Sequence, residues 1–254
     1  MINLIEKLSK MIEESVRHLV DNKDVAIAFS GGVDSTLMAF LSKRYAHSVH
    51  LYTVGFENSE DIKYSKRIAP MLELPHNIYY LDPEKSKYYY NLVENTLKLG
   101  FLKSEILAPL AYLFDVVKEK FVVFGAASEE LFCGYERYYT WLKEGITNEE
   151  INKRLIEEYE FLGMKGDIWA IKEIGNIFNK ISLFPLYQEN IARFVFDIPL
   201  NIRMKDVIRK KYLIREVAKY FSLPEITVNR KKRALQYGTG FHKTILKMKK
   251  RGEI

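Results

Sequence analysis

The sequence has a single cysteine, Cys133, among its 254 residues. One cysteine excludes an intrachain disulfide, and it excludes a zinc or iron–sulfur site built only from cysteines of one chain. Long apolar runs are also missing, because none approaches the ~20 residues that a membrane-spanning helix requires. The first amphipathic segment carries Glu6, Lys7 and Lys10 within its apolar pattern, which a secretory signal would not. We therefore expect a cytoplasmic protein with no membrane partner, working in a reducing compartment.

Two common phosphate-binding motifs are missing as well. No lysine follows the glycines in the spacing of a Walker loop, and the G-x-G-x-x-G dinucleotide motif does not occur. The stretch from Val25 to Thr36, VAIAFSGGVDST, is nevertheless a short apolar strand pattern that runs through two glycines into a helix pattern. Glycines at such a turn let backbone N–H groups approach an anion at the helix N-terminus.

This turn predicts a phosphate site, and Asp34 is the one acid placed to help hold Mg²⁺ there. The alternative is an ordinary glycine-rich turn whose Asp and Ser cap a helix. The formal net charge of +6 suits a polyanionic ligand and leaves RNA possible. We interpret the basic segment 242–251 as a solvated helix face rather than an RNA-binding tail, and so favour small-molecule partners over nucleic acid.

Strand and helix patterns alternate through the first half of the chain, which predicts a parallel sheet with helices on both faces. The strands are expected at 25–29, 49–54, 77–81 and 121–124, and the helices at 4–20, 33–41, 60–72, 85–99 and 104–120. Later patterns are mainly helical, at 129–142, 148–162, 167–179, 186–196 and 206–221. We expect a doubly wound, Rossmann-like α/β fold forming one domain over residues 1–254. Its nucleotide-binding core would be 1–128, and the helical elaboration 129–254 would complete the site.

Three longer stretches, in order, give a more specific match. They are LYTVGFENSEDIKYSKRIAPMLELPH, VVFGAASEELFCGY and KYLIREVAKYFSLPEITVNRKKRALQYGTG. Together with SGGVDS they resemble the synthetase domain of asparagine synthetases and of β-lactam synthetase, within the PP-loop ATP pyrophosphatases. The resemblance runs from about residue 25 to residue 240. It implies the fold of the adenine nucleotide alpha-hydrolases, with ATP and Mg²⁺ as cofactors.

The resemblance also implies roles for individual residues. Loop residues would hold the pyrophosphate of ATP, residues at strand ends would flank adenosine, and two acids would bind Mg²⁺. The first group is Ser30, Gly31, Gly32, Asp34 and Ser35, the second is Ala28, Val54, Phe124 and Gly125, and the third is Asp34 and Glu129. Adjacent acids at a helix N-terminus can also simply be stabilised by the positive end of the helix dipole, which is the role we give to Glu130.

Three basic residues complete the catalytic set that the resemblance implies. Lys211 and Arg215 are four residues apart, so we expect them to share a helix face near the phosphates. Lys232 would neutralise charge that develops on the α phosphate and the acyl oxygen in the transition state. The alternative for residues 230–233 is a basic, solvated run. The segment 238–240 resembles the family's glycine-rich closing segment and is a candidate lid.

Two departures from the family pattern affect the second half of the reaction. The glutamate that is the proposed base in asparagine synthetases is Ala126 here, and alanine cannot take a proton. The chain begins Met1-Ile2-Asn3 rather than with the family's catalytic cysteine, so we expect no glutaminase domain. Nitrogen would then come from solution, from another substrate or from a separate glutaminase subunit. Cys133 stands at a glycine position of the family motif, and we expect it to pack rather than react.

The combined interpretation is an AMP-forming carbon–nitrogen ligase. It would activate a small-molecule carboxylate as an acyl-adenylate, release pyrophosphate, and transfer the acyl group to ammonia or an amine. Two alternatives stay open: a tRNA-modifying PP-loop pyrophosphatase, and a non-catalytic ATP-binding partner of a separate glutaminase. The sequence leaves the acyl substrate, the nucleophile and homo-oligomerisation undetermined.

Overall fold

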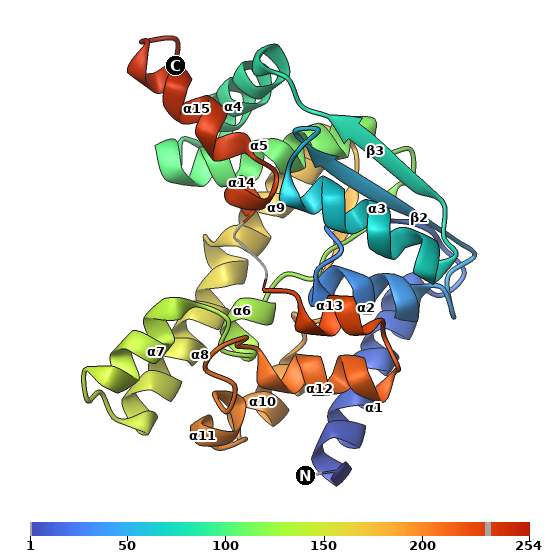
Figure 1. The fold of residues 1–254 in the computed structure, drawn as a ribbon, viewed down its shortest axis with the longest axis vertical. Helices are drawn as coiled ribbons and strands as arrows, with labels where there is room; N and C mark the ends of the chain where they lie inside the picture. Colours follow the sequence, from blue (N-terminus) through green and yellow to red (C-terminus); the bar gives the residue numbers. More distant parts are fainter. Residues whose placement is uncertain (1, 232–234) are drawn as a thin grey trace.

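The computed structural model describes residues 2–231 and 235–254 and is built around one five-stranded sheet (Figure 1). All four strand pairings are parallel, and the order is β3-β2-β1-β4-β5. The strands are β1 Asp24–Ala28, β2 Ser48–Gly55, β3 His76–Tyr80, β4 Phe121–Val123 and β5 Ile181–Leu183. Because helices connect and cover these strands, the predicted doubly wound α/β class is confirmed.

Helices pack on both faces of the sheet. One layer contains α1 Ile2–Val20, α2 Val33–Ser42, α3 Glu60–Leu72 and α12 Tyr212–Tyr220, and the other contains α4 Pro83–Leu97, α5 Phe101–Val116 and α9 Asp167–Ile177. From β1 the chain adds β2 and β3 on one side, and it then returns to add β4 and β5 on the other. Right-handed crossovers place the connecting helices of these two halves on opposite faces. The reversal between β1 and β4 is the position where ligands bind in such sheets.

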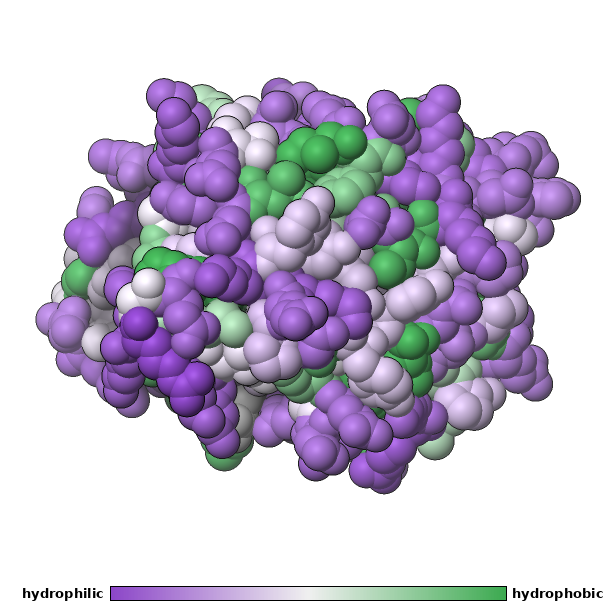
Figure 2. Space-filling model, turned by 90° about the horizontal axis from the view of Figure 1, so that it is seen from above, coloured by the Kyte–Doolittle hydropathy of each residue, from purple (hydrophilic) through white to green (hydrophobic). Residues whose placement is uncertain are grey.

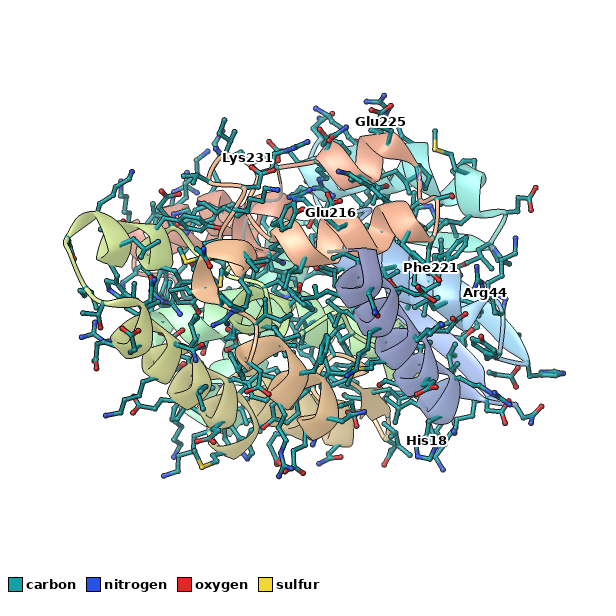
Figure 3. The ribbon with its side chains drawn as sticks, turned by 90° about the horizontal axis from the view of Figure 1, so that it is seen from below. His18, Arg44, Glu216, Phe221, Glu225 and Lys231 are labelled. Carbon is teal, nitrogen blue, oxygen red and sulfur yellow. The ribbon has the colours of Figure 1, made fainter. Side chains whose placement is uncertain are left out.

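The helical second half packs directly on this core. Figure 3 shows α12, which carries Glu216, lying across α1, and the two helices are in contact. Beyond the helix end, the Phe221 ring lies against Phe40 of α2, and the Arg44 guanidinium is 5.2 Å from the Phe221 ring centre. Helix α12 and the residues that follow it therefore share the packing of the core.

Two predicted helices are wrong in extent, and one strand is missing from the prediction. The single helix expected at 129–142 is two helices, because Cys133 adopts a left-handed φ of 55° that interrupts it. The helix expected from residue 206 begins only at Tyr212, and β5 was not foreseen. The remaining helices are α6 Ser128–Leu131, α7 Glu136–Lys143, α8 Asn148–Met164, α10 Glu189–Phe196, α11 Leu200–Arg203, α13 Glu225–Asn229, α14 Leu235–Gly238 and α15 Phe241–Lys250.

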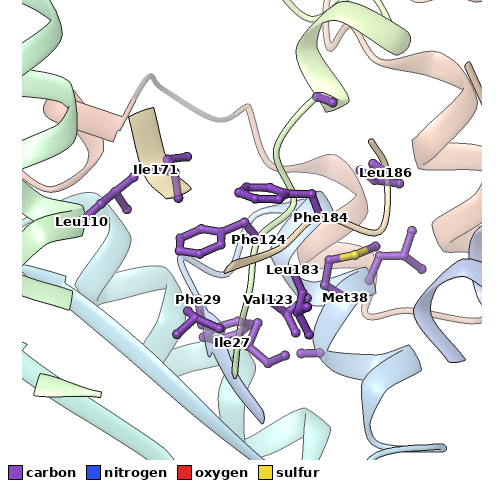
Figure 4. Packing of buried hydrophobic residues seen from close by; sticks show 14 of the residues in the cluster. Ile27, Phe29, Met38, Leu110, Val123, Phe124, Ile171, Leu183, Phe184 and Leu186 are labelled. Atoms are coloured by element: carbon purple, nitrogen blue, oxygen red, sulfur yellow. The ribbon is translucent and has the colours of Figure 1, made fainter. Parts of the chain in front are cut away.

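Aromatic and aliphatic side chains fill the space above β1 and β4 (Figure 4). Phe124 follows β4 and stacks on Phe184, with ring centres 5.6 Å apart and planes 22° from parallel. The face seen in Figure 2 is mostly hydrophilic, with separate apolar patches. Within the described ranges, no helix has the length and apolar character needed to cross a membrane.

Candidate active site

The turn after β1 has the conformation that the sequence predicted. Gly31 has φ of +71°, and a Cβ there would lie 3.0 Å from the backbone of Tyr64, so only glycine fits. Two serine hydroxyls form hydrogen bonds within the turn. The Gly32 N–H donates to Ser30 Oγ (3.4 Å), and Ser35 Oγ donates to the Gly32 carbonyl (3.2 Å). The turn then leads into α2, whose first acid is Asp34.

A buried ion cluster links this turn to two distant segments. Asp34 accepts a 2.5 Å hydrogen bond from Ser128 Oγ on Oδ1, and its Oδ2 lies 2.8 Å from Lys211 Nζ. The same Nζ lies 2.7 Å from Glu129 Oε1. Burial alone would lower the pKa of Lys211, but the two carboxylates outweigh it and hold the pKa above its usual value. One cation thus bridges the two acids expected to bind metal.

The donor set around this cluster fits a hard cation. Gly134 leaves the necessary room, since a Cβ there would lie 1.7 Å from Glu129 Oε2 and 2.6 Å from Lys211 Cε. Within residues 2–231 and 235–254, no group of three or more His, Cys, Asp or Glu side chains converges as a metal cage. Two carboxylates with further oxygens from phosphate and water are what Mg²⁺ commonly uses in nucleotide sites. Asp34 and Glu129 are therefore compatible with holding Mg²⁺ together with a nucleotide.

The expectation that Lys211 and Arg215 share a helix face is wrong. Lys211 precedes α12 as its N-cap with φ of 54°, and Lys210 before it is also left-handed. Two such residues in succession are costly for non-glycine side chains, and such strain persists where surrounding contacts hold it. Arg215 instead donates hydrogen bonds to backbone carbonyls, including that of Val228. The distance from Arg215 Nη2 to the Arg230 carbonyl oxygen is 3.0 Å. The Arg215 guanidinium also donates to the carbonyls of Arg209 and Lys210, so it joins the segment before α12 to the segment that follows it.

A second buried ion pair was missed by the sequence analysis. Arg230 donates to the Ser30 carbonyl (2.5 Å) and to Asp61 Oδ1 (2.6 Å), and its guanidinium lies 4.1 Å from the Tyr64 ring centre. The Arg230 and Asp61 side chains are 0% and 1% exposed. The solvated-run interpretation is therefore wrong for Arg230, whose contacts join the C-terminal segment to the loop. Lys232, the predicted transition-state cation, lies outside the described residues.

A cavity of about 540 Å³ opens beside the loop at the carboxyl ends of β1 and β4. All four predicted adenosine residues line it, as do three of the five predicted pyrophosphate residues and Glu129. These lining residues are Ala28, Val54, Phe124 and Gly125, with Ser30, Asp34 and Ser35. Gly31 and Gly32 lie in the same turn outside the lining set. Leu107 and Leu110 of α5 and Ile171 of α9 add an apolar wall, which Figure 4 shows in part.

Further polar side chains, to which the sequence analysis gave no role in the site, also line the cavity. Tyr135, Arg137, Glu158 and Asp167 come from the α6–α9 region, and Lys103 comes from α5. These residues meet through tertiary packing of helices far apart in the chain, so no local motif signals them.

Glu130 lines the cavity too, although its sequence position suggested only a helix-dipole role. Its side chain is 5% exposed overall, and burial, with the nearby Glu129 carboxylate, raises its pKa to about 7. Ala126 lines the cavity without any titratable group. Cys133 is fully buried and packs with Tyr138, as expected for a residue that does not react.

Comparison with known proteins matches the sequence of this chain to a family. The model of the asparagine synthase family covers residues 7–171 of the chain. The chain belongs to the asparagine synthase family. It thus contains an asparagine synthase-like domain of the PP-loop ATP pyrophosphatase type.

Individual relatives are distant and cover different lengths. The chain is 26% identical to a Methanocaldococcus jannaschii protein assigned as a glutamine-hydrolysing asparagine synthetase, over 97% of this chain and 51% of that protein. It is 26% identical to an NH₃-dependent NAD⁺ synthetase of Campylobacter jejuni, over 54% of this chain and 56% of that protein. It spans about half the length of these relatives. A solved NMN synthetase from Francisella tularensis covers 98% of this chain and 85% of its own, at 12% identity and a TM-score of 0.47.

Proposed function

We propose that this protein activates a carboxylate with ATP as an acyl-adenylate and then transfers the acyl group to ammonia or an amine. The observation that carries the proposal is the cluster of Asp34, Glu129 and Lys211 beside the glycine turn, whose two carboxylates line the cavity. Carboxylates for a metal, a cation for phosphate and a glycine turn at a helix N-terminus are the parts that adenylation needs. They meet at the switch point of the sheet, where a nucleotide is expected.

In this proposal, the loop from Ser30 to Ser35 binds the β and γ phosphates, which leaves the α phosphate facing the rest of the cavity. A carboxylate oxygen attacks the α phosphorus, the bond to the bridging oxygen breaks, and pyrophosphate leaves with the electron pair. Asp34 and Glu129 would hold Mg²⁺, which when bound neutralises phosphate charge. Lys211 would move from between the carboxylates onto the phosphates. Lys232 keeps the role implied by the resemblance.

The second step has less support from the residues of the site. A nitrogen lone pair attacks the acyl carbon, AMP leaves, and the nitrogen must lose a proton. Ala126 lines the cavity where the family's proposed base would stand, and it cannot accept that proton. This observation favours a second candidate function, in which the chain binds ATP as a non-catalytic partner of a separate glutaminase. The two candidates differ in whether the first step occurs.

Exchange of labelled pyrophosphate into ATP with a panel of carboxylic acids separates them. We expect exchange that requires one class of acid and Mg²⁺, and that falls at least about 100-fold in Asp34→Asn because an interaction with the phosphates is lost. Lys219→Met is the control, since the exposed Lys219 side chain pairs with Glu216 on α12. ATP binding without exchange for any acid would refute the ligase proposal and favour the non-catalytic one.

A further inference from the structure

The part of the cavity away from the nucleotide loop has mostly apolar walls. Leu102 and Ile106 of α5, Phe161 and Leu162 of α8, and Ile168 of α9 all line it. Leu162 and Ile168 are buried, whereas Leu102 and Phe161 are 60% and 50% exposed at the surface. Apolar walls of this extent favour a ligand whose body is also apolar, because a polar ligand would lose hydration without regaining hydrogen bonds.

The charged lining residues are almost all paired with one another. Among residues 2–231 and 235–254, six acidic and two basic side chains line the cavity, so this described part of the lining is acidic. Within the described part of the chain, both of the bases and five of the six acids are held in ion pairs. These pairs are Asp34 and Glu129 with Lys211, Asp61 with Arg230, Glu158 with Arg137, and Asp167 with Lys103.

Glu130 is the exception. Its side chain is at least nine-tenths buried and lines the cavity, and no other described side chain forms a hydrogen bond or an ion pair with it. Its own backbone N–H is its hydrogen-bond donor. A carboxylate removed from water in this way is costly unless a cation is supplied. Because Glu130 lines the cavity, a cation of a bound ligand can reach its carboxylate from there.

On the basis of the proposed function, we propose that the acyl substrate is a monocarboxylic acid with an apolar body and a protonated amino group, and that Glu130 binds this amino group. The carboxylate to be activated would face the nucleotide loop, and the apolar body would lie against α5 and α8. Aspartate fits poorly, because its second carboxylate would meet apolar walls and Glu130. Both described bases of the lining, Lys103 and Arg137, are already paired.

Matched acids that differ only in the amino group test the proposal. Pyrophosphate–ATP exchange is measured with leucine against 4-methylpentanoate, with 6-aminohexanoate against hexanoate, and with aspartate. We expect the amino acid of at least one pair to exceed its amine-free partner at least tenfold in kcat/KM, and to exceed aspartate by a similar factor. Glu130→Gln should reduce that ratio at least tenfold. Glu160→Gln, an exposed acid on α8, should leave the ratio unchanged.

Calorimetric binding of the same acids separates the subsite from the reaction. If no acid supports exchange but wild-type protein still binds the amine-bearing member more tightly, the ligase proposal fails and the Glu130 subsite stands. If exchange occurs and aspartate is the best acid, or if neither pair shows an amine preference, the ligase stands and the subsite is refuted. An unchanged ratio in folded Glu130→Gln protein also refutes it. The wild-type ratios decide the question if that variant does not fold.

Discussion

Replacing Lys211 with methionine should turn the ion cluster into a site whose stability depends on divalent cations. The side chain is 7% exposed and bridges Asp34 and Glu129 at 2.8 and 2.7 Å. Removing one partner of a buried pair commonly costs ~3–5 kcal/mol, because the remaining charge is left uncompensated. Glu129 is 32% exposed, and water screens part of its charge. We therefore expect the lower end, about 3 kcal/mol in EDTA.

Magnesium should restore part of this loss, because it supplies the missing positive charge to the two carboxylates. At about ten times its dissociation constant, a ligand specific for the folded state adds about 1.4 kcal/mol to the free energy of unfolding. Urea unfolding followed by circular dichroism, in EDTA and in MgCl₂, measures both changes. In the wild-type protein Lys211 already neutralises the site, so the response to magnesium without nucleotide should be much smaller.

Two further variants make this test specific. The double variant Lys211→Met/Glu129→Gln should lose less stability than the sum of its single changes and should respond weakly to magnesium, since one carboxylate is gone. Lys219→Met should change the free energy of unfolding by less than about 0.5 kcal/mol. Equal stabilisation of the wild-type protein and Lys211→Met by MgCl₂ would show that the carboxylates do not form the cation site.

Three other outcomes follow from the structure. Gly134→Ala should lower the free energy of unfolding by ~1–3 kcal/mol in urea titrations, because its Cβ would lie 1.7 Å from Glu129 Oε2. Burial, and less so Lys66, lowers the pKa of His76 to about 4 from 6.5, so stability present above pH 6.5 is lost as the pH falls towards 4. Allowing for its partial exposure, we expect about 1 kcal/mol of that loss by pH 5, and His76→Phe should lack it. The buried thiol of Cys133, whose pKa burial raises to about 11, should react with a disulfide reagent at pH 8 only after denaturation.

The sequence predicted the parts of the fold that depend on local pattern. Helix α3 lies where it was expected, at Glu60–Leu72, and the turn after β1 follows from its two glycines. The short strand β5 was missed because Ile181–Leu183 has three residues, too few for an alternating pattern. The break at Cys133 was hidden because a cysteine in the left-handed region carries no local signal.

The site was predictable only where a motif marked it. Asp34 and Glu129 were identified from such motifs, and the structure brings both to Lys211. Arg230 was given no role beyond the alternative of a solvated basic run, and Glu130 was interpreted as a helix-dipole acid, yet they are 3% and 5% exposed. What distinguishes them is burial and the presence or absence of a partner, which depend on how α6, α8 and α13 pack. Sequence spacing does not report those properties.

The two halves of the chain should unfold together, because the sheet that carries the loop is complete only with β5 from the second half. One continuous apolar core contains residues of both halves, and the pairs of Lys211 with Asp34 and of Arg230 with Asp61 cross between them. We therefore propose a single domain over residues 1–254. The chain's two tryptophans, Trp141 and Trp169, both report on the second half. Their fluorescence should change at the same urea concentration as the circular dichroism signal of the whole chain. An earlier fluorescence transition would mean that residues 129–254 detach from a core that stays folded.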